Sequence, residues 1–390
     1  MVEAIEVQRI TDWLVETTLG SFDLEKFFPE FCQRVANAGI DICRGHIGVK
    51  TLHPLYNSLV MTWQQRRGLL VEKIGFDVDP AAWERSPLSA LIQSGEEYAY
   101  YDLEAGNNWQ NYTLLKELSE AGNTGYLGLL IPFGRSETTV AQQDGLVASW
   151  ATDKEGGFSD PEILALRRLS SRLALAVKVH KREQTASNVL NAYLGEDAGQ
   201  RVLNGRIQRG DVDSIDAIVW YSDLRESTRL AAELEPQEFM TLLSSYFERT
   251  GQPITDHGGS ILKFVGDAIL GIFPVNERVG LQRASREAVQ AAWESVESLK
   301  NEKVMVKGVE ESLVMGVGLH FGKILFGNAG LPDRLEFTMI GATVNETCRI
   351  EGLTKTSEHS ILVSETIKDN VPIEWDFIGQ EELRGVPELN

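Results

Sequence analysis

Residues 258–274 read GGSILKFVGDAILGIFP, and this stretch predicts a tight β-hairpin. Two apolar runs, Ile261–Val265 and Ala268–Phe273, flank the dipeptide Gly266-Asp267. A two-residue loop that begins with glycine, between two such runs, is typical of a type II′ turn. The pattern therefore places Asp267 at the tip of a hairpin, on a loop that a sheet would hold in place.

A second aspartate follows a neighbouring apolar run. Residues 217–221 (AIVWY) predict a short buried strand, and Asp223 stands just past its end. If both aspartates lie at the same rim of one sheet, they form an all-oxygen site that suits Mg²⁺ or Mn²⁺. An aspartate in a turn is often only a turn residue, so the spacing alone leaves both interpretations open.

The rest of the C-terminal half predicts a domain over residues 214–390. Residues 222–228 (SDLREST) leave the first strand and enter a helix, whose first N–H groups could hold phosphate oxygens. The order β–α–α–β–β–α–β indicates an α/β (α+β) fold around a mostly antiparallel sheet. Its other expected elements are a helix from Pro236, a helix over Asn276–Lys300, a strand over Val314–Phe321, a glycine-rich segment over 322–330 and a helix from Ala342.

Residues 1–185 predict a separate α/β domain, followed by a helical linker over 186–213. Leucines at 166, 169 and 173 recur at helical spacing, which fits a helix that packs on its own domain or pairs with its twin. The order of elements resembles a GAF or PAS sensor domain in architecture only. The expected elements are helices over Ile5–Thr17 and Asp23–Ala38, strands over His46–Leu52, Ser58–Gln64, Glu97–Tyr101, Tyr126–Pro132 and Gly145–Ala151, and a helix from Pro161.

Composition narrows the class of protein. The chain has 390 residues, 43% of them apolar, and a formal net charge of −20, which disfavours binding to nucleic acids and to anionic membranes. Its three widely spaced cysteines indicate neither a disulfide framework nor a zinc site. The first residues lack the pattern of a signal peptide, and no apolar run is long enough to span a membrane, so the cytoplasm is the expected location.

Four stretches in order resemble the class III adenylyl and guanylyl cyclases. They are WYSDLRESTRL (220–230), the hairpin segment 258–274, VGLHFGKILFGNAG (317–330) and FTMIGATVNETCRIEGLTK (337–355). The resemblance covers most of residues 214–390 and implies a ferredoxin-like catalytic domain. It also implies an adenylate cyclase, which converts ATP to 3′,5′-cyclic AMP and pyrophosphate with two Mg²⁺ or Mn²⁺ ions.

By that resemblance Asp223 and Asp267 are the metal ligands, together with the carbonyl of Leu224. The sequence departs from the family at Glu226-Ser227, where many members carry Gly-Phe. We expect this departure to change packing near the phosphate loop without abolishing metal binding.

The resemblance also assigns the base-reading and transition-state residues. Lys263 donates to N1 of adenine, and Thr338 accepts from its amino group; threonine there marks the branch called class IIIb. Asn345 and Arg349 lie four residues apart, hence on one helix face, and orient the ribose and stabilise the α-phosphate. Arg384 and Arg334 are further phosphate contacts in this interpretation, although a surface role is equally compatible with the sequence.

In the family, active sites are composite, so a homodimer with two equivalent shared sites is expected. An unknown small-molecule effector of the N-terminal domain is also compatible with this arrangement. The alternatives are a guanylate or pyrimidine nucleotide cyclase and a catalytically silent nucleotide-binding protein. A diguanylate cyclase is disfavoured because the hairpin reads FVGD and lacks the GGDEF signature.

Overall fold

The computed structural model describes residues 4–77, 83, 85–105, 108–134 and 144–379, in two compact units. The units are Met1–Val189 and Leu190–Asn390, so the division falls within a few residues of the expected end of the first domain. No helix among the described residues is long and apolar enough to cross a membrane.

The N-terminal unit is built on a six-stranded antiparallel sheet with the order β3-β2-β1-β6-β5-β4. Five of these strands coincide with the apolar runs expected from sequence. The strand β3 was not expected; it returns from β2 through a turn at Arg67 and Gly68, with Gln64 opposite Gly68. The strands are β1 (Arg44–Lys50), β2 (Ser58–Gln64), β3 (Gly68–Ile74), β4 (Tyr98–Asp102), β5 (Gly125–Pro132) and β6 (Gly145–Thr152).

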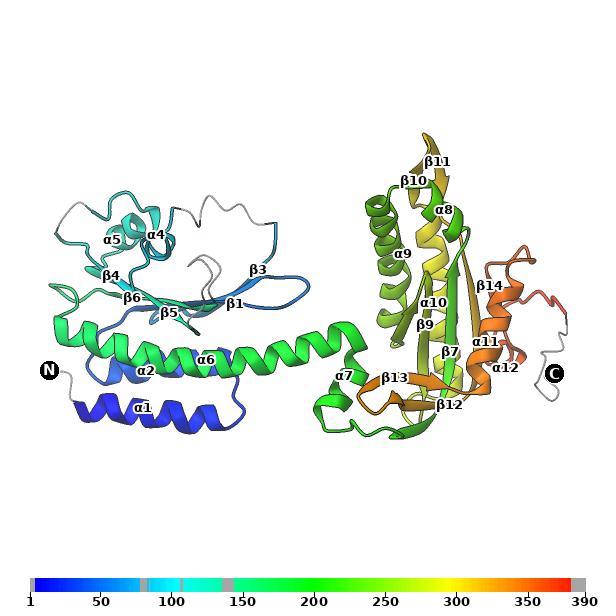
Figure 1. The fold of residues 1–390 in the computed structure, drawn as a ribbon, viewed down its shortest axis with the longest axis horizontal. Coiled ribbons are helices and arrows are strands. Elements are labelled where there is room, and N and C mark those ends of the chain that lie inside the picture. Colours follow the sequence, from blue (N-terminus) through cyan, green and yellow to red (C-terminus); the bar gives the residue numbers. More distant parts are fainter. Residues whose placement is uncertain (1–3, 78–82, 84, 106–107, 135–143, 380–390) are drawn as a thin grey trace. The chain divides into compact units, whose positions relative to one another are not determined.

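Helices cover both faces of this sheet (Figure 1). One face carries α1 (Ala4–Leu19), α2 (Leu24–Asn37) and the long α6 (Asp160–Leu194), and the other carries α4 (Pro87–Ser94) and α5 (Thr113–Glu120). The leucine stripe of α6 is buried in this unit's own core with Phe28, Phe31 and Trp150. The stripe therefore packs on its own domain over Leu166–Ala176, which is one of the two arrangements that the spacing allowed.

The C-terminal unit is built on a mostly antiparallel sheet with the order β13-β12-β7-β9-β8, and β14 pairs in parallel with β12. The expected hairpin is present, because Val265 pairs with Ala268 across Gly266-Asp267 and Gly266 has a φ of 63°. The strands are β7 (Val212–Leu224), β8 (Ser260–Val265), β9 (Ala268–Val275), β12 (Met315–Leu331), β13 (Arg334–Ile340) and β14 (Ile361–Val363).

Two long helices cover one face of this sheet, and α11 covers part of the other. Trp220 and Phe273 point from the sheet into a core with Tyr246 of α9 and Ala288 of α10. Glycines of β12 lie directly under α11 on the opposite face. The helices are α7 (Glu196–Leu203), α8 (Ser227–Glu233), α9 (Pro236–Asp256), α10 (Leu281–Lys300), α11 (Ala342–Leu353) and α12 (Glu365–Asn370), and β10 (Lys303–Val306) pairs with β11 (Val309–Ser312).

The structure adds detail in two segments to which the sequence assigned little. The glycine-rich segment 322–330, for which no secondary structure was predicted, is a strand, because β12 continues through Leu331. A Cβ at Gly322 would come within 2.5 Å of the Thr343 hydroxyl oxygen, so the glycine serves close packing there. The linker 186–213 is helical as far as Leu203 apart from a break at Gly195, where φ is 81°, and its last residues begin β7.

Candidate active site

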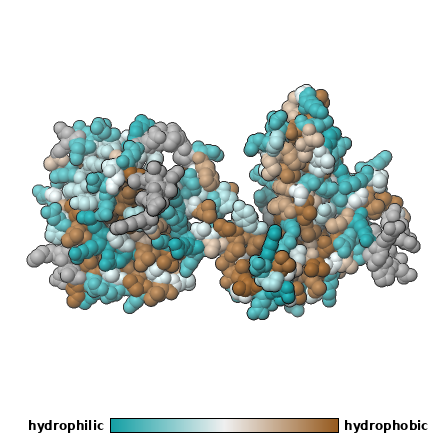
Figure 2. All heavy atoms as spheres, viewed as in Figure 1, coloured by the Kyte–Doolittle hydropathy of each residue, from teal (hydrophilic) through white to brown (hydrophobic). Residues whose placement is uncertain are grey.

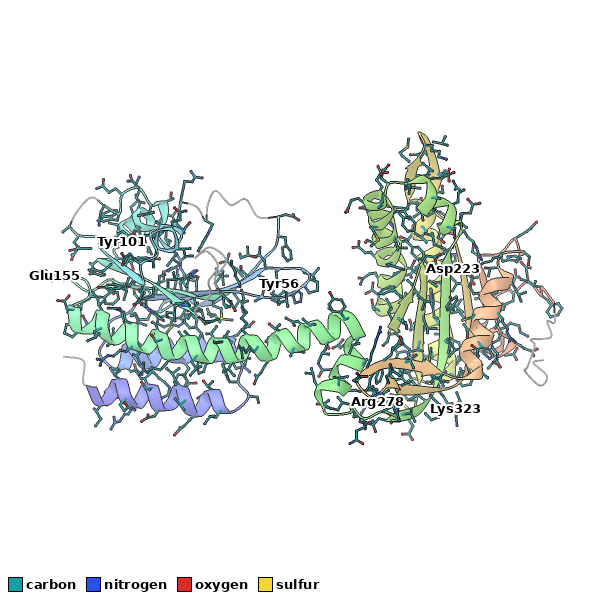
Figure 3. The ribbon with its side chains drawn as sticks, viewed as in Figure 1. Tyr56, Tyr101, Glu155, Asp223, Arg278 and Lys323 are labelled. Atoms are coloured by element: carbon teal, nitrogen blue, oxygen red, sulfur yellow. The ribbon has the colours of Figure 1, made fainter. Side chains whose placement is uncertain are left out.

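Two carboxylates meet at one end of the sheet, as the sequence predicted. The register pairs Asp223 near the end of β7 with Ala268, so the hairpin tip brings Asp267 beside Asp223. Burial, a hydrogen bond with Asp267 and the charge of Asp267 raise the pKa of Asp223, and Lys355 opposes this shift. Figure 3 marks Asp223 near the end of β7. Burial and a neighbouring carboxylate both disfavour the charged form of an aspartate.

A cavity of ≈ 730 Å³ opens beside these carboxylates. The segment Leu224–Leu230 lines it with both aspartates, so the phosphate loop inferred from the sequence faces the same space. Arg229 in this wall is held by carboxylates of Glu226, Glu233 and Glu311. Glu226 has a φ of 56°, a left-handed conformation that glycine adopts at lower cost, which explains why many family members carry glycine there.

The donor set fits a hard divalent cation. Asp223 and Asp267 offer carboxylate oxygens in the cavity, Leu224 also lines it, and the other two lining carboxylates, Glu226 and Glu311, are paired with Arg229. Within the described part of the chain, no group of three or more His, Cys, Asp or Glu side chains is placed to hold an ion. Mg²⁺ is commonly bound through one or two carboxylates, with water and substrate phosphates completing its coordination. The pair therefore suits an ion that arrives with, or is completed by, a nucleotide.

A second charged group enters the same cavity from the end of α11. The Nζ of Lys355 lies 3.3 Å from Oδ2 of Asp223. Arg225, two residues after Asp223, also contacts the end of α11: its Nη1 lies 3.2 Å from Oε1 of Glu351, and its Nη2 donates to the hydroxyl of Thr354. Sequence analysis assigned no role to these residues, although Lys355 is the last residue of the fourth matching stretch.

The two residues predicted to read the base, Lys263 and Thr338, lie on strands β8 and β13. Lys263 of β8 forms an ion pair with Glu336 of β13. Glu336 and Thr338 are two residues apart on that strand and hence on the same face. The structure therefore brings Lys263 to the face of β13 that carries Thr338, and it adds Glu336, which the sequence analysis did not single out.

The structure places Asn345 and Arg349 elsewhere, on the exposed side of α11. Neither residue lines the cavity with Asp223 and Asp267. The inner side of α11 is fixed instead by a buried contact, in which Nε2 of His320 lies 2.8 Å from Oε2 of Glu346. Burial lowers the pKa of His320 and outweighs the opposing effect of Glu346. A single chain thus does not bring the predicted transition-state residues to its own metal carboxylates.

Of the two weaker phosphate predictions, Arg334 does not line this cavity. Arg334 is exposed at the start of β13, opposite Leu331 at the β12–β13 turn. Arg384 lies outside the described residues. Figure 2 shows apolar side chains gathered over the part of the unit where α7 and β13 lie, and the exposed apolar residues there include Leu203, Leu331, Leu335 and Ile340.

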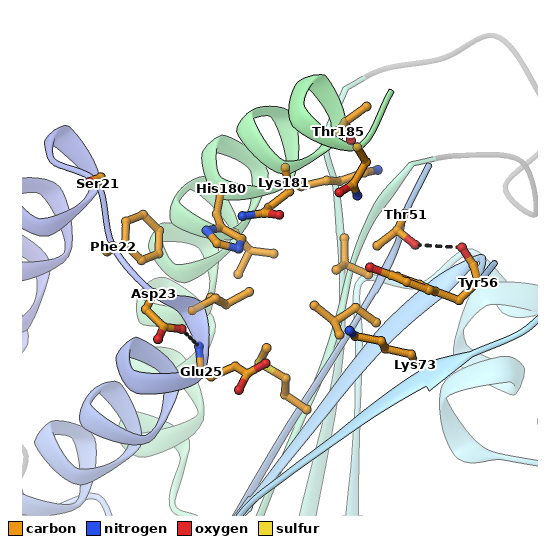
Figure 4. A pocket seen from close by; sticks show the side chains of 17 residues that line it. Ser21, Phe22, Asp23, Glu25, Thr51, Tyr56, Lys73, His180, Lys181 and Thr185 are labelled. Atoms are coloured by element: carbon orange, nitrogen blue, oxygen red, sulfur yellow. Dashed lines mark hydrogen bonds between the residues drawn. The ribbon is translucent and has the colours of Figure 1, made fainter. Parts of the chain in front are cut away.

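A further cavity, of ≈ 520 Å³, belongs to the N-terminal unit (Figure 4). Its floor is apolar, with Leu59, Met61 and Val177, and charged groups approach it from several elements. Glu25 lies at the start of α2, Lys73 on β3 and His180 on α6 (Figure 4). Burial lowers the pKa of His180.

The C-terminal unit is similar to known cyclases. The family model of the adenylate and guanylate cyclase catalytic domain matches residues 211–387. An adenylate cyclase of Anabaena cylindrica is 28% identical over 252 residues, which are 63% of this chain and 49% of the relative. A terminal-differentiation-specific adenylate cyclase of Dictyostelium discoideum is 32% identical over 200 residues, which are 50% of this chain and 9% of the relative.

The chain thus spans about half the length of the first relative and much less of the second. Among solved structures, the guanylyl cyclase Cya2 is 30% identical, with 46% of this chain and 90% of that chain covered and a TM-score of 0.39. The adenylyl cyclase CyaB from P. aeruginosa is 27% identical, with 41% and 82% covered and a TM-score of 0.36.

Proposed function

We propose that this chain converts ATP to 3′,5′-cyclic AMP and pyrophosphate, because residues 211–387 match the family model of the adenylate and guanylate cyclase catalytic domain. The observation that carries the proposal is the pair Asp223 and Asp267, brought together at one sheet end beside a cavity that the phosphate loop lines. Two curated relatives named as adenylate cyclases support the choice of ATP.

In the proposed reaction the ribose 3′-oxygen attacks the α-phosphorus and pyrophosphate leaves. Such transfers are catalysed mainly by positioning and electrostatic stabilisation. Two Mg²⁺ or Mn²⁺ ions, held by Asp223, Asp267 and the Leu224 carbonyl, would activate the 3′-hydroxyl and neutralise the triphosphate. Backbone N–H groups of residues 225–228 bind phosphate oxygens, and Arg349 offsets charge at the α-phosphate. Asn345 orients the ribose.

The choice of base is assigned to Lys263 and Thr338. The ammonium of Lys263 donates to N1 of adenine, and the hydroxyl of Thr338 accepts from the amino group. Guanine carries a hydrogen on N1, so a cation that can only donate at that position disfavours GTP. Glu336 holds Lys263 on the same face of β13 and is available to fix the ammonium for this contact.

We further propose that the enzyme is a homodimer with composite sites. Asn345 and Arg349 lie outside the cavity of their own metal carboxylates, so a second copy is needed to supply them. The exposed apolar side chains of Leu331, Leu335 and Ile340 offer a surface for such a contact. The cavity beside His180 is the place that we propose for a small-molecule effector, because its volume falls in the range of ligand sites.

The proposal is tested with an equimolar mixture of ATP, GTP, CTP and UTP, the full chain, and Mg²⁺ or Mn²⁺. Mass spectrometry should detect 3′,5′-cyclic AMP as the main cyclic product. A predominance of cyclic GMP or of a cyclic pyrimidine nucleotide would reassign the base while leaving the reaction intact. No cyclic product from any nucleotide would favour a silent nucleotide-binding protein. The variant Asp267→Asn, which keeps the size of the side chain, is the inactive control.

A further inference from the structure

The end of α11 is fastened to the metal-binding end of β7 by buried contacts. Glu351 and Thr354 are 3% and 5% exposed, and both contact the guanidinium of Arg225, which follows Leu224 directly. The hydroxyl of Thr354 also donates to the carbonyl of Glu351 at 2.6 Å. Because buried ion pairs and hydrogen bonds of this kind are costly to break, they fix where the next residue, Lys355, leaves the helix.

Lys355 consequently enters the cavity at the metal carboxylates. Its Nζ lies 3.3 Å from Oδ2 of Asp223, and the side chain lines the same cavity as Asp267. Arg225 is engaged with Glu351, so Lys355 is the cation that faces the aspartate pair from α11. Arg229, the other cation in the cavity wall, is held by three glutamates.

Two carboxylates that meet without a cation repel each other. A divalent ion and an ammonium that seek the same carboxylate oxygen compete for it, since like charges at that distance repel. The ion pair of Lys355 therefore stabilises the empty site and opposes metal entry. For a metal ion to enter, the exposed side chain of Lys355 has only to move away from Asp223.

We propose that Lys355 acts as a cationic placeholder, which neutralises the Asp223–Asp267 pair in the empty site and yields its position to the metal ion. The inference rests on the metal site of the proposed function. The ion pair of Lys355 with Asp223 makes the metal affinity of the nucleotide-free enzyme lower than the two carboxylates alone would give. Metal binding then depends more strongly on the nucleotide, whose phosphates supply the missing ligands and a new partner for the released ammonium.

The test measures Mn²⁺ binding to the nucleotide-free full chain by the electron paramagnetic resonance signal of free Mn²⁺. Lys355→Met keeps the approximate length of the side chain and removes the charge that competes with the ion. The variant should bind Mn²⁺ about fivefold more tightly than the wild type. The effect is limited to this size because the side chain of Lys355 is half exposed and the ion pair is screened by solvent. Lys355→Arg should retain the wild-type affinity. Lys368→Met changes the net charge equally on α12, which does not line the cavity, and should leave the affinity unchanged.

A second readout tests the empty site directly. In EDTA, Lys355→Met should melt at a lower temperature than the wild type, and saturating Mn²⁺ should remove that deficit. An equal or weaker Mn²⁺ affinity of Lys355→Met, including no binding by either protein, would overturn the inference. So would equal tightening by Lys368→Met, which would show a general effect of net charge. Cyclic product formed by the wild type, measured in parallel, reports separately on the proposed function.

Discussion

At the scale of single residues, the fold of the backbone brings several carboxylate side chains close together at the site. Sheet register sets Asp223 beside Asp267, and burial raises the pKa of Asp223 further. Nearby, Glu351 is almost fully buried, and burial raises its pKa against the opposing effect of Arg225. Such clusters cost stability, and they persist where the charges serve binding or catalysis. The placeholder proposed for Lys355 is one way to limit that cost.

A histidine away from the site gives a prediction of pH dependence. Nδ1 of His257 lies 2.8 Å from Glu287, and its Nε2 lies 3.1 Å from Glu294. Burial alone would lower the pKa of His257, but the hydrogen bonds to Glu287 and Glu294 outweigh it, so the pKa is raised. A raised pKa means that the stabilisation is complete below the unfolded value near 6.5 and is lost as pH rises through the folded value.

His257→Gln should therefore destabilise the C-terminal unit by up to about 1 kcal/mol at pH 6, and by less at pH 9. Urea unfolding at the two pH values measures the difference. An equal cost at both would show that the imidazole contributes packing alone.

At the scale of elements, the position of α11 is set by glycines of β12. A Cβ at Gly318 would come within 2.6 Å of the backbone N of Glu351 and the backbone O of Thr347, so α11 lies directly on the strand. The contact of His320 with Glu346 adds a second attachment. Because α11 carries Asn345 and Arg349 outside and Lys355 at its end, any shift of the helix moves all three.

Gly318→Ala tests this arrangement. Because backbone atoms cannot withdraw as a flexible side chain can, the variant should displace α11 and lower stability by roughly 1–3 kcal/mol. Its cyclase activity should fall at temperatures where it remains folded, as measured by cyclic nucleotide formed. Gly352→Ala is the matched control, since a Cβ there meets nothing within 4 Å and alanine favours a helix. Equal losses in both variants would contradict the account of the close contact.

The elements that sequence predicted are those with local signals. The hairpin at Gly266-Asp267 follows from turn chemistry, and the burial of β7 follows from a continuous apolar run. The sequence predicted a strand only as far as Phe321, because the packing role of the glycines in residues 322–330 becomes visible only once the helix above them is known. The contact of Lys355 with Asp223 was missed because it depends on a crossing of α11 over β12, which no local pattern encodes.

At the scale of the whole molecule, the two units have separate cores, and the proposed chemistry belongs to the second. The Asp223–Asp267 pair and the exposed face of α11 lie in the same unit but not in the same cavity. The homodimer that we propose would resolve this separation, because under two-fold symmetry each copy completes the site of the other.

Mixing two inactive variants tests the composite site. Asp267→Ala and Arg349→Ala should each be inactive as homodimers. Random exchange of equal amounts yields heterodimers with one intact site, so activity should return to about a quarter of the wild-type level. Size-exclusion chromatography with light scattering confirms that dimers are present. Persistent inactivity of confirmed, exchanged dimers would contradict shared sites.

The stoichiometry of the products shows whether the Asp223–Asp267 site cyclises ATP. The full chain, incubated with ATP and Mn²⁺, should release 3′,5′-cyclic AMP and pyrophosphate in equal amounts, quantified by mass spectrometry and an enzymatic pyrophosphate assay. Asp223→Asn should lose both products together. Linear AMP with pyrophosphate, ADP with phosphate, or cyclic AMP that persists in Asp223→Asn would contradict the account.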